Sequence, residues 1–145
     1  MKNRDLMAVH REEFDLSTSG EVEIIDITGR VRDVVRRSGI SEGICLVFVP
    51  GATGAITTIE YEPGLLEDFP DALERMVPKG IEYKHHLRWH DGNGHSHVRA
   101  SLLGPDLTVP VADGDLLLGT WQQIVFVELD VRRRTRRIVV QIVGE

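Results

Sequence analysis

Residues 107–145, LTVPVADGDLLLGTWQQIVFVELDVRRRTRRIVVQIVGE, decide the fold class because they read as β structure throughout. A DG turn at positions 113–114 precedes an apolar strand at 124–129, and a second apolar strand follows at 138–143. The connection RRRTRR, at 132–137, is basic. We therefore predict that the last two strands form a hairpin and that their arginine-rich connection is a solvated turn or a subunit contact.

The segments before it alternate between strand and helix signals. Residues 21–28, EVEIIDIT, predict a strand, after which Thr28 is placed to cap a helix. That helix has a helical repeat of valines and ends before Gly39. The run ICLVFVP at 44–50 predicts a strand buried on both faces, in which Cys45 is a buried small hydrophobe rather than a nucleophile.

The middle of the chain continues this pattern. Residues 51–60 predict a further strand, and residues 65–77 have helical spacing that Pro70 should divide into two short helices or a kink. Gly51 and Gly54 could let backbone N–H groups approach an anion, although the segment lacks the Walker pattern. No linker interrupts the chain. We therefore expect residues 1–145 to form a single α+β domain.

A dense histidine cluster is the clearest functional signal. Residues 83–104, YKHHLRWHDGNGHSHVRASLLG, hold five of the six histidines of the chain. If the part after the GNG turn is extended, His95, His97 and Arg99 point to one face, which histidines of the incoming segment could also reach. Imidazole is the commonest protein ligand for zinc, so a metal or phosphate site is favoured over an ordinary polar hairpin.

Composition excludes other classes of function. The chain has 145 residues, 41% of them hydrophobic, and a formal net charge of −6, which disfavours wholesale binding to nucleic acid or to anionic membranes. No apolar run approaches a membrane span, and the polar start lacks a signal-peptide core. The single cysteine cannot form an internal disulfide. We therefore expect a cytoplasmic protein.

Three blocks of the sequence carry a family resemblance. They are VFVPGATGAITTIE at 47–60, YKHHLRWHDGNGHSHVRASLLGP at 83–105 and VPVADGDLLLGTWQQIVFVELD at 109–130, followed by the arginine-rich connection and the closing strand. With these blocks in this order, the chain resembles the YjbQ-like family, also called the secondary thiamine-phosphate synthase family. The resemblance implies a two-sheet β-sandwich with a few helices that assembles as a homotrimer.

The resemblance also implies an activity. Some members have a weak thiamine-phosphate synthase activity, which joins hydroxymethylpyrimidine pyrophosphate to thiazole phosphate and releases pyrophosphate. The family pattern matches Tyr83, His85 and His97, the segment Gly119-Thr120-Trp121-Gln122, and the acid Glu60. Many members have a histidine where this chain has Gly51, so His95 or His90 would have to supply a third metal ligand.

These considerations lead to two functional hypotheses. In the first, a divalent cation, with zinc as first candidate and nickel or another ion as alternatives, is held by His85, His95 and His97 and binds a small phosphorylated substrate. The expected catalytic residues are Glu60, Arg99 and Gln122, and the expected substrate-binding residues are Thr53, Asn93, Trp121 and Gln122. Lys84 is an alternative to Arg99. In the second, the chain is a non-catalytic trimeric protein that binds a metal or a small ligand.

Four residues receive specific structural expectations. Trp121 and Gln122 are adjacent in a segment expected to be extended, so they should point to opposite sides. We expect Trp121 to be largely buried, because its large apolar body is usually covered, and Gln122 to face the histidine pocket. His85 and His97 should lie close enough to share an ion.

Overall fold

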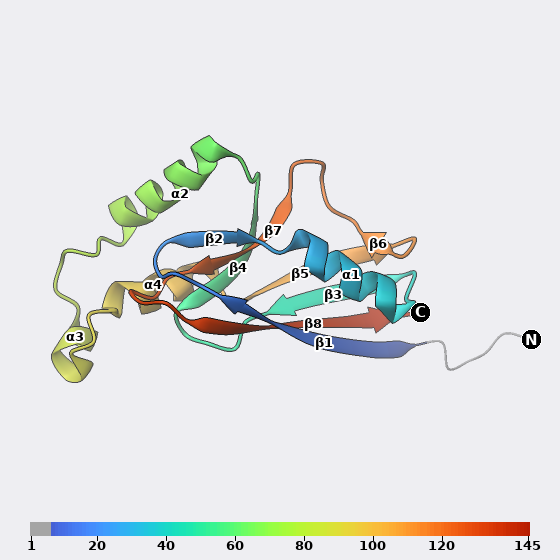
Figure 1. The fold of residues 1–145 in the computed structure, drawn as a ribbon, viewed down its shortest axis with the longest axis horizontal. Helices are drawn as coiled ribbons and strands as arrows, with labels where there is room; N and C mark the ends of the chain where they lie inside the picture. Colours follow the sequence, from blue (N-terminus) through green and yellow to red (C-terminus); the bar gives the residue numbers. More distant parts are fainter. Residues whose placement is uncertain (1–6) are drawn as a thin grey trace, which may run out of the picture.

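The computed structural model describes residues 7–145, which form eight strands and four helices (Figure 1). The strands are β1 (Ala8–Ser17), β2 (Glu23–Asp26), β3 (Gly43–Phe48), β4 (Gly54–Ile59), β5 (Asp106–Ala112), β6 (Asp115–Leu116), β7 (Gln123–Glu128) and β8 (Thr135–Gly144). The helices are α1 (Thr28–Ser38), α2 (Pro63–Met76), α3 (Lys84–Trp89) and α4 (Gly94–Leu103). Within residues 7–145, none of these helices is long and apolar enough to cross a membrane.

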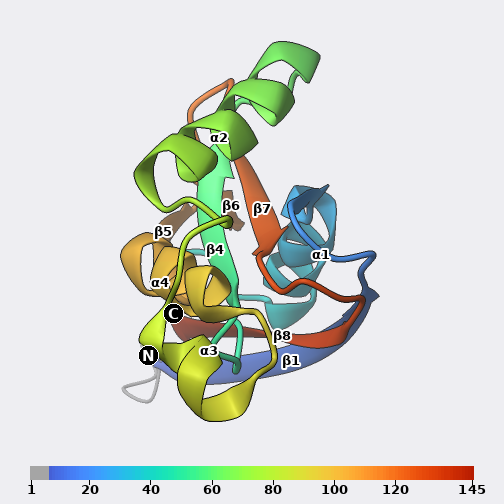
Figure 2. The ribbon, with the colours of Figure 1, turned by 90° about the vertical axis from the view of Figure 1, so that its left-hand side faces the viewer.

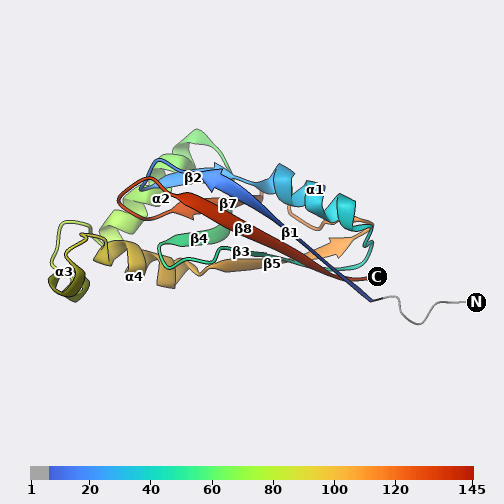
Figure 3. The same ribbon diagram turned by 60° about the horizontal axis from the view of Figure 1, so that its bottom comes forward.

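The strands form two antiparallel sheets. The larger sheet has the order β1-β8-β3-β5-β6, and the smaller has the order β2-β7-β4. Figure 3 shows β1, β8, β3 and β5 running side by side, with α1 near one end of this layer. The structure therefore confirms the predicted α+β fold with two sheets.

The smaller sheet lies between two apolar clusters. Figure 2 shows α2 and α4 on one side of β4 and β7, and α1 on the other. On the α1 side, Ile124 and Phe126 of β7 pack with the inward residues of the larger sheet. On the opposite side, Val125 and Val127 pack with Leu73 of α2 and Ala100 of α4. β7 is consequently buried on both faces.

The strand that we expected to be buried on both faces is a different one. In β3, Cys45 and Val47 are buried, whereas the alternate residue Ile44 is 53% exposed and Phe48 is also exposed. This prediction was wrong because the larger sheet has a second layer on only one side. The prediction for Cys45 is confirmed, since it is fully buried in the main core.

The predicted hairpin of the last two strands does not form. β7 pairs with β2 and β4 in the smaller sheet, while β8 pairs with β1 and β3 in the larger one. β8 finds its longest partner at the start of the chain, where Ala8–Ser17 pair with Thr135–Gly144 over their whole length. Alternation of apolar residues predicts a strand but not its partner, because every inward face here is similarly apolar.

The histidine stretch is helical and not extended. The N–H groups of Ser96 and His97 donate to the Asn93 carbonyl at 3.0 and 3.2 Å, which begins α4. Gly94 starts this helix because a Cβ there would collide with the Tyr83 side chain. The prediction of a strand was wrong. Ala100 and Leu103 pack against the smaller sheet with the spacing of a helix, and over a few residues the apolar pattern of a helix can be mistaken for the alternation of a strand.

The other helices follow the sequence more closely. α1 buries Val31, Val34 and Val35 and ends at Gly39, whose φ of 70° suits glycine. The hydroxyl of Thr28 does not cap α1 and instead donates to Asp26 at 2.7 Å. α2 is one continuous helix through Pro70, so the predicted alternative of two short helices was wrong. Its packing against the second apolar cluster outweighs the hydrogen bond that the proline removes.

Candidate functional site

His85 and His97 meet where α3 approaches α4. Their ring centroids are 4.5 Å apart. The Nδ1 atom of His85 lies 3.3 Å from a carboxylate oxygen of Asp91. The expected proximity of the two rings is therefore present, although they come from two helices and not from adjacent strands. An acid facing Nδ1 leaves Nε2 of His85 as its ligating nitrogen, an arrangement common around protein-bound metals.

The His97 ring favours the neutral state that a metal requires. Burial lowers the pKa of His97 below its ordinary value, and the neighbouring His85 lowers it further. Asp91 and Asp130 act in the opposite direction without reversing the shift. A neutral imidazole offers a lone pair to a cation at neutral pH without first losing a proton.

Asn93 and Thr53 lie next to this pair. The Asn93 amide sits between the carboxylates of Asp91 and Asp130 and fits best with its nitrogen toward Asp91, at 2.8 and 3.2 Å from the two oxygens. In the other orientation the nitrogen is 3.3 Å from Asp130, but the amide oxygen then faces only carboxylate oxygens. The Thr53 hydroxyl donates to Asp130 at 3.0 Å. Of the four predicted substrate-binding residues, Asn93 and Thr53 thus lie on the histidine side of the molecule, and both are largely buried.

A buried ion-pair network supports this side of the site. Arg136 donates to both oxygens of Glu128, at 2.8 and 2.5 Å, and Arg134 donates to Asp130 at 3.0 and 2.6 Å. Burial alone would raise the pKa of Asp130, but hydrogen bonds from Arg134 and from the Val131 N–H outweigh it and lower the pKa. Arg136 also donates to the Thr53 hydroxyl at 2.8 Å, so the network fixes the loop that precedes β4.

Sequence reasoning missed this network. It assigned the whole RRRTRR tract to a solvated turn or a subunit contact, yet the side chains of Arg134 and Arg136 are engaged by buried acids of the same chain. The available signal was the pair of acids in the apolar strand VFVELD, since Glu128 and Asp130 would need partners if buried. Arg132 and Arg133 remain exposed, as predicted for a turn.

A small pocket opens beside His97. Its volume is about 180 Å³, and its walls come from the loop before β4 and from α4. The lining residues are Gly51, Ala52, Gly54, His97, Ala100, Ser101 and Pro105. The pocket therefore places glycine-rich backbone, which an anion can approach closely, next to one of the two candidate ligands.

His95 does not join the other two histidines. It is fully buried, and its Nε2 atom lies 2.7 Å from a carboxylate oxygen of Glu21. Positions two residues apart in a helix point to nearly opposite sides, so His95 and His97 could share a face only in the strand that we predicted. His90, the alternative third ligand, ends α3 in a left-handed conformation and is exposed.

Arg99 is engaged in contacts that hold the fold together. Its guanidinium is buried and donates to the Val77 carbonyl at 3.0 and 2.9 Å and to Glu74 at 3.1 Å. It thereby joins α4 to the end of α2. The alternative cation, Lys84, is at the first position of α3.

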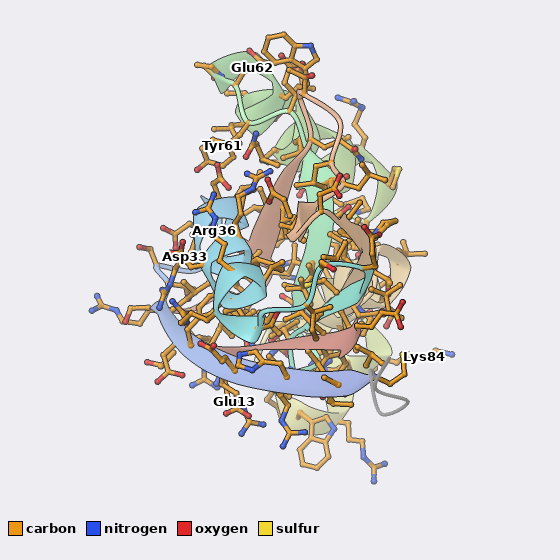
Figure 4. The ribbon with its side chains drawn as sticks, turned by 90° about the vertical axis from the view of Figure 1, so that its right-hand side faces the viewer. Glu13, Asp33, Arg36, Tyr61, Glu62 and Lys84 are labelled. Atoms are coloured by element: carbon orange, nitrogen blue, oxygen red, sulfur yellow. The ribbon has the colours of Figure 1, made fainter. Side chains whose placement is uncertain are left out.

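Glu60, Trp121 and Gln122 lie at the other end of the smaller sheet. Ile59 pairs with Gln123 at that end, whereas Gly54 pairs with Glu128 near the histidines. Five residues of strand separate the two ends by about 17 Å. Figure 4 shows the neighbouring Tyr61 and Glu62 far from Lys84, the first residue of α3.

The expectations for Trp121 and Gln122 were therefore wrong. Trp121 is 72% exposed because it belongs to a turn before β7 and not to the strand itself. The side chain of Gln122 does not face the histidine pocket, since its Oε1 atom accepts a hydrogen bond from the Gly119 N–H at 2.8 Å.

The described residues fit a metal in part. Within residues 7–145, no set of three or more His, Cys, Asp or Glu side chains is placed to hold an ion. His85 and His97 fit two ligand positions, and Asp91 fits the role of orienting His85. An ion on these two residues would complete its coordination with water or substrate oxygens, as catalytic metals do and closed structural zinc sites do not.

Comparison with known proteins identifies the family of the chain. Residues 12–145 match the family model described as UPF0047 protein YjbQ-like. The chain belongs to this family. A UPF0047 protein of Methanothermobacter thermautotrophicus is 46% identical over all of this chain and 99% of the relative. A UPF0047 protein of Archaeoglobus fulgidus is 45% identical over 89% of this chain and 98% of the relative.

Solved structures of UPF0047 relatives have the same fold. A YbjQ-like protein of unknown function from Sulfolobus solfataricus superposes with a TM-score of 0.92 and 42% identity, over 96% of this chain and 99% of that one. A YjbQ/UPF0047 family protein from Clostridium acetobutylicum has a TM-score of 0.83 and 38% identity, over 90% of this chain and 98% of that one. Sequence and structure thus both assign the chain to the UPF0047 family.

Proposed function

We propose that this UPF0047 protein is a weak, metal-assisted thiamine-phosphate synthase in which His85 and His97 hold a divalent cation, with zinc as the first candidate. The observation that supports the proposal is the approach of the two rings to 4.5 Å, next to an acid that orients one of them. A bound cation would supply positive charge where pyrophosphate leaves the pyrimidine.

The chain's own residues would do the remaining work. Asp91 fixes the orientation of His85, and burial keeps His97 neutral and able to ligate. The pocket beside His97 has a glycine-rich wall that a phosphate group can approach. The network around Asp130 holds that wall through Thr53, so substrate would meet a preformed surface.

The expected homotrimer belongs to the same proposal. The larger sheet has an uncovered face on which Val9 and Ile44 are 66% and 53% exposed and Phe48 is exposed as well. Facing such a surface with another copy removes apolar area from water. Glu60 and Gln122 could act at the histidine pair only if a neighbouring copy brought them there. A cytoplasmic location remains part of the proposal.

A second candidate is a non-catalytic trimeric protein that binds a metal or a small ligand. It is favoured by the position of the three expected catalytic residues. Arg99 is engaged in structural contacts, and Glu60 and Gln122 lie at the far end of the sheet. Both candidates use the same histidine pair, so they differ only in whether bound substrates react.

The test measures ion binding and turnover in the same samples. Zinc affinity is measured by competition with a chromophoric chelator, and pyrophosphate release is followed after mixing with the pyrimidine pyrophosphate and the thiazole phosphate. His85→Ala and His97→Ala should each weaken zinc binding by about 100-fold and abolish release, whereas His10→Gln, on β1, should change neither. Zinc binding without pyrophosphate release would favour the second candidate. Unchanged zinc binding in both alanine variants would contradict both.

A further inference from the structure

A second pocket lies away from the histidines. It has a volume of about 400 Å³ and opens where β4 ends and β7 begins. Its walls come from the β2 end at Asp26, the segment after β4 and the turn before β7. Tyr61 and Glu62, which line it, are at the top of the view in Figure 4. This pocket has no residue in common with the pocket beside His97.

Two aromatic side chains stand at this pocket with much of their surface in water. Trp121 is 72% exposed and Tyr61 is 40% exposed. Hydrogen bonds hold the Tyr61 side chain and the backbone of the turn that carries Trp121. The Tyr61 hydroxyl donates to the Ile24 carbonyl at 2.8 Å, and the turn that carries Trp121 is closed by a bond from the Gln122 N–H to the Gly119 carbonyl at 3.0 Å. The Tyr61 ring and the backbone of the turn at Trp121 are therefore fixed before any ligand arrives.

The charge of the pocket has one sign. Asp26, Glu60 and Glu62 line it, and the described lining includes no Lys, Arg or His. Asp26 already accepts hydrogen bonds from Thr28, and Glu62 accepts from two N–H groups at the start of α2. Among residues 7–145, the Glu60 carboxylate forms no hydrogen bond or ion pair with another side chain. The pocket thus has one uncommitted acid facing an aromatic wall.

These features specify a class of ligand. Three carboxylates repel phosphate, so this pocket cannot be where a pyrophosphate binds. An aromatic face attracts a cation, and a carboxylate pairs with a planar N–H group through charge-assisted hydrogen bonds. We propose that the pocket binds a small planar organic cation, with an amidinium or protonated amine at Glu60 and its flat body against Trp121. This site does not depend on the metal site of the proposed function.

Benzamidine is a suitable probe because it joins a flat ring to an amidinium. Trp89→Phe leaves Trp121 as the only tryptophan of the chain, so its fluorescence reports binding directly. In this background, benzamidine should quench the emission and saturate, and neutral benzamide should bind at least about tenfold more weakly. Benzoate, an anion of similar shape, should not bind.

Two further variants test the assigned contacts by calorimetry. Glu60→Gln should weaken benzamidine binding about tenfold, while Glu67→Gln, which removes an exposed acid of α2 outside the pocket, should leave it unchanged. Trp121→Ala should weaken it several-fold. Near-ultraviolet circular dichroism and urea unfolding check that each variant is folded.

Three results would overturn the proposal. The first is equal affinity of the protein for benzamide and benzamidine. The second is equal benzamidine affinity of the Glu60→Gln and Glu67→Gln variants. The third is that the protein binds no benzamidine while the variants in this pocket change its sedimentation. The last result would assign the pocket to a side chain of a second copy. His85→Ala and His97→Ala should retain benzamidine affinity, so a failure of the metal site is distinguishable from a failure of this pocket.

Discussion

His85 and His97 face each other at 4.5 Å between ring centroids, although α3, which carries His85, buries none of its own residues. The contact is maintained by the chain around α3. The Gly94 N–H donates to His86 Nε2 at 2.9 Å, and the Tyr83 hydroxyl donates to the Pro78 carbonyl. The pair thus combines a candidate ligand on a helix that packs against the smaller sheet with one on a surface helix.

The titration of His97 should respond in opposite directions to its two charged neighbours. Burial and His85 lower its pKa, whereas Asp91 raises it. His85→Ala should therefore raise the pKa of His97, and Asp91→Asn should lower it further. Nuclear magnetic resonance of the ring protons across pH 4 to 8 measures both. Shifts of the same sign in the two variants would contradict the assigned causes.

The same shift predicts a pH dependence of stability. The pKa of His97 is lower in the folded chain than its ordinary value of about 6.5, so the unfolded chain binds the proton more readily. The contribution of His97 is present above that ordinary value and is lost as the pH falls through the folded pKa. His97→Asn should flatten this part of the stability profile, measured by urea unfolding at several pH values.

Neighbouring arginines of the basic tract should differ sharply in their effect on stability. Arg136 is buried against Glu128, whereas Arg137 is exposed and 3.8 Å from Glu13. Arg136→Met leaves a buried carboxylate unpaired and should lower the free energy of unfolding by about 3 to 5 kcal/mol. Arg137→Met should change it by no more than about 0.5 kcal/mol. Urea unfolding of both variants tests this, and similar losses would contradict the network's importance.

Local signals predicted local structure well. α1 could be predicted because Val31, Val34 and Val35 repeat with the period of a helix and Gly39 permits its left-handed end. β3 and β4 could be located from apolar and β-branched runs. β1, in contrast, could not be located in this way, because polar residues occupy alternate positions and much of its surface is exposed in the described chain.

Long-range relationships were beyond the sequence patterns. Which sheet β7 and β8 enter depends on partners at residues 8–17 and 54–59, and no local repeat encodes that choice. The pairing of His85 with His97 was predictable from a dense cluster around a turn. The exclusion of His95 was not, because it follows from α4 being a helix, in which alternate residues diverge.

Trp121 should contribute little to stability in spite of its size. Its side chain is 72% exposed, whereas Phe126, on the β7 strand of the same segment, is fully buried in the main core. Trp121→Ala should change the free energy of unfolding by about 0.5 kcal/mol or less, and Phe126→Ala should cost about 3 to 5 kcal/mol. Thermal and urea unfolding provide the measurement. A large loss in Trp121→Ala that depends on protein concentration would show that another copy covers this residue.

Cys45 should be unreactive in the folded protein. It is fully buried in β3, and burial raises the pKa of its thiol to about 12, so almost no thiolate forms at neutral pH. Since thiolate is the reactive species, a disulfide reagent such as Ellman's should modify the native chain only as fast as the core opens. Adding urea beyond the unfolding midpoint should expose one thiol per chain, the number in the sequence.

Two variants serve as controls. Cys45→Ala removes the signal and serves as the blank. Cys45→Ser tests the environment, because an unpaired hydroxyl in this core should destabilise the fold by about 1 to 3 kcal/mol. Rapid, stoichiometric modification of the native protein would show that β3 opens readily and would contradict the packing of the two sheets.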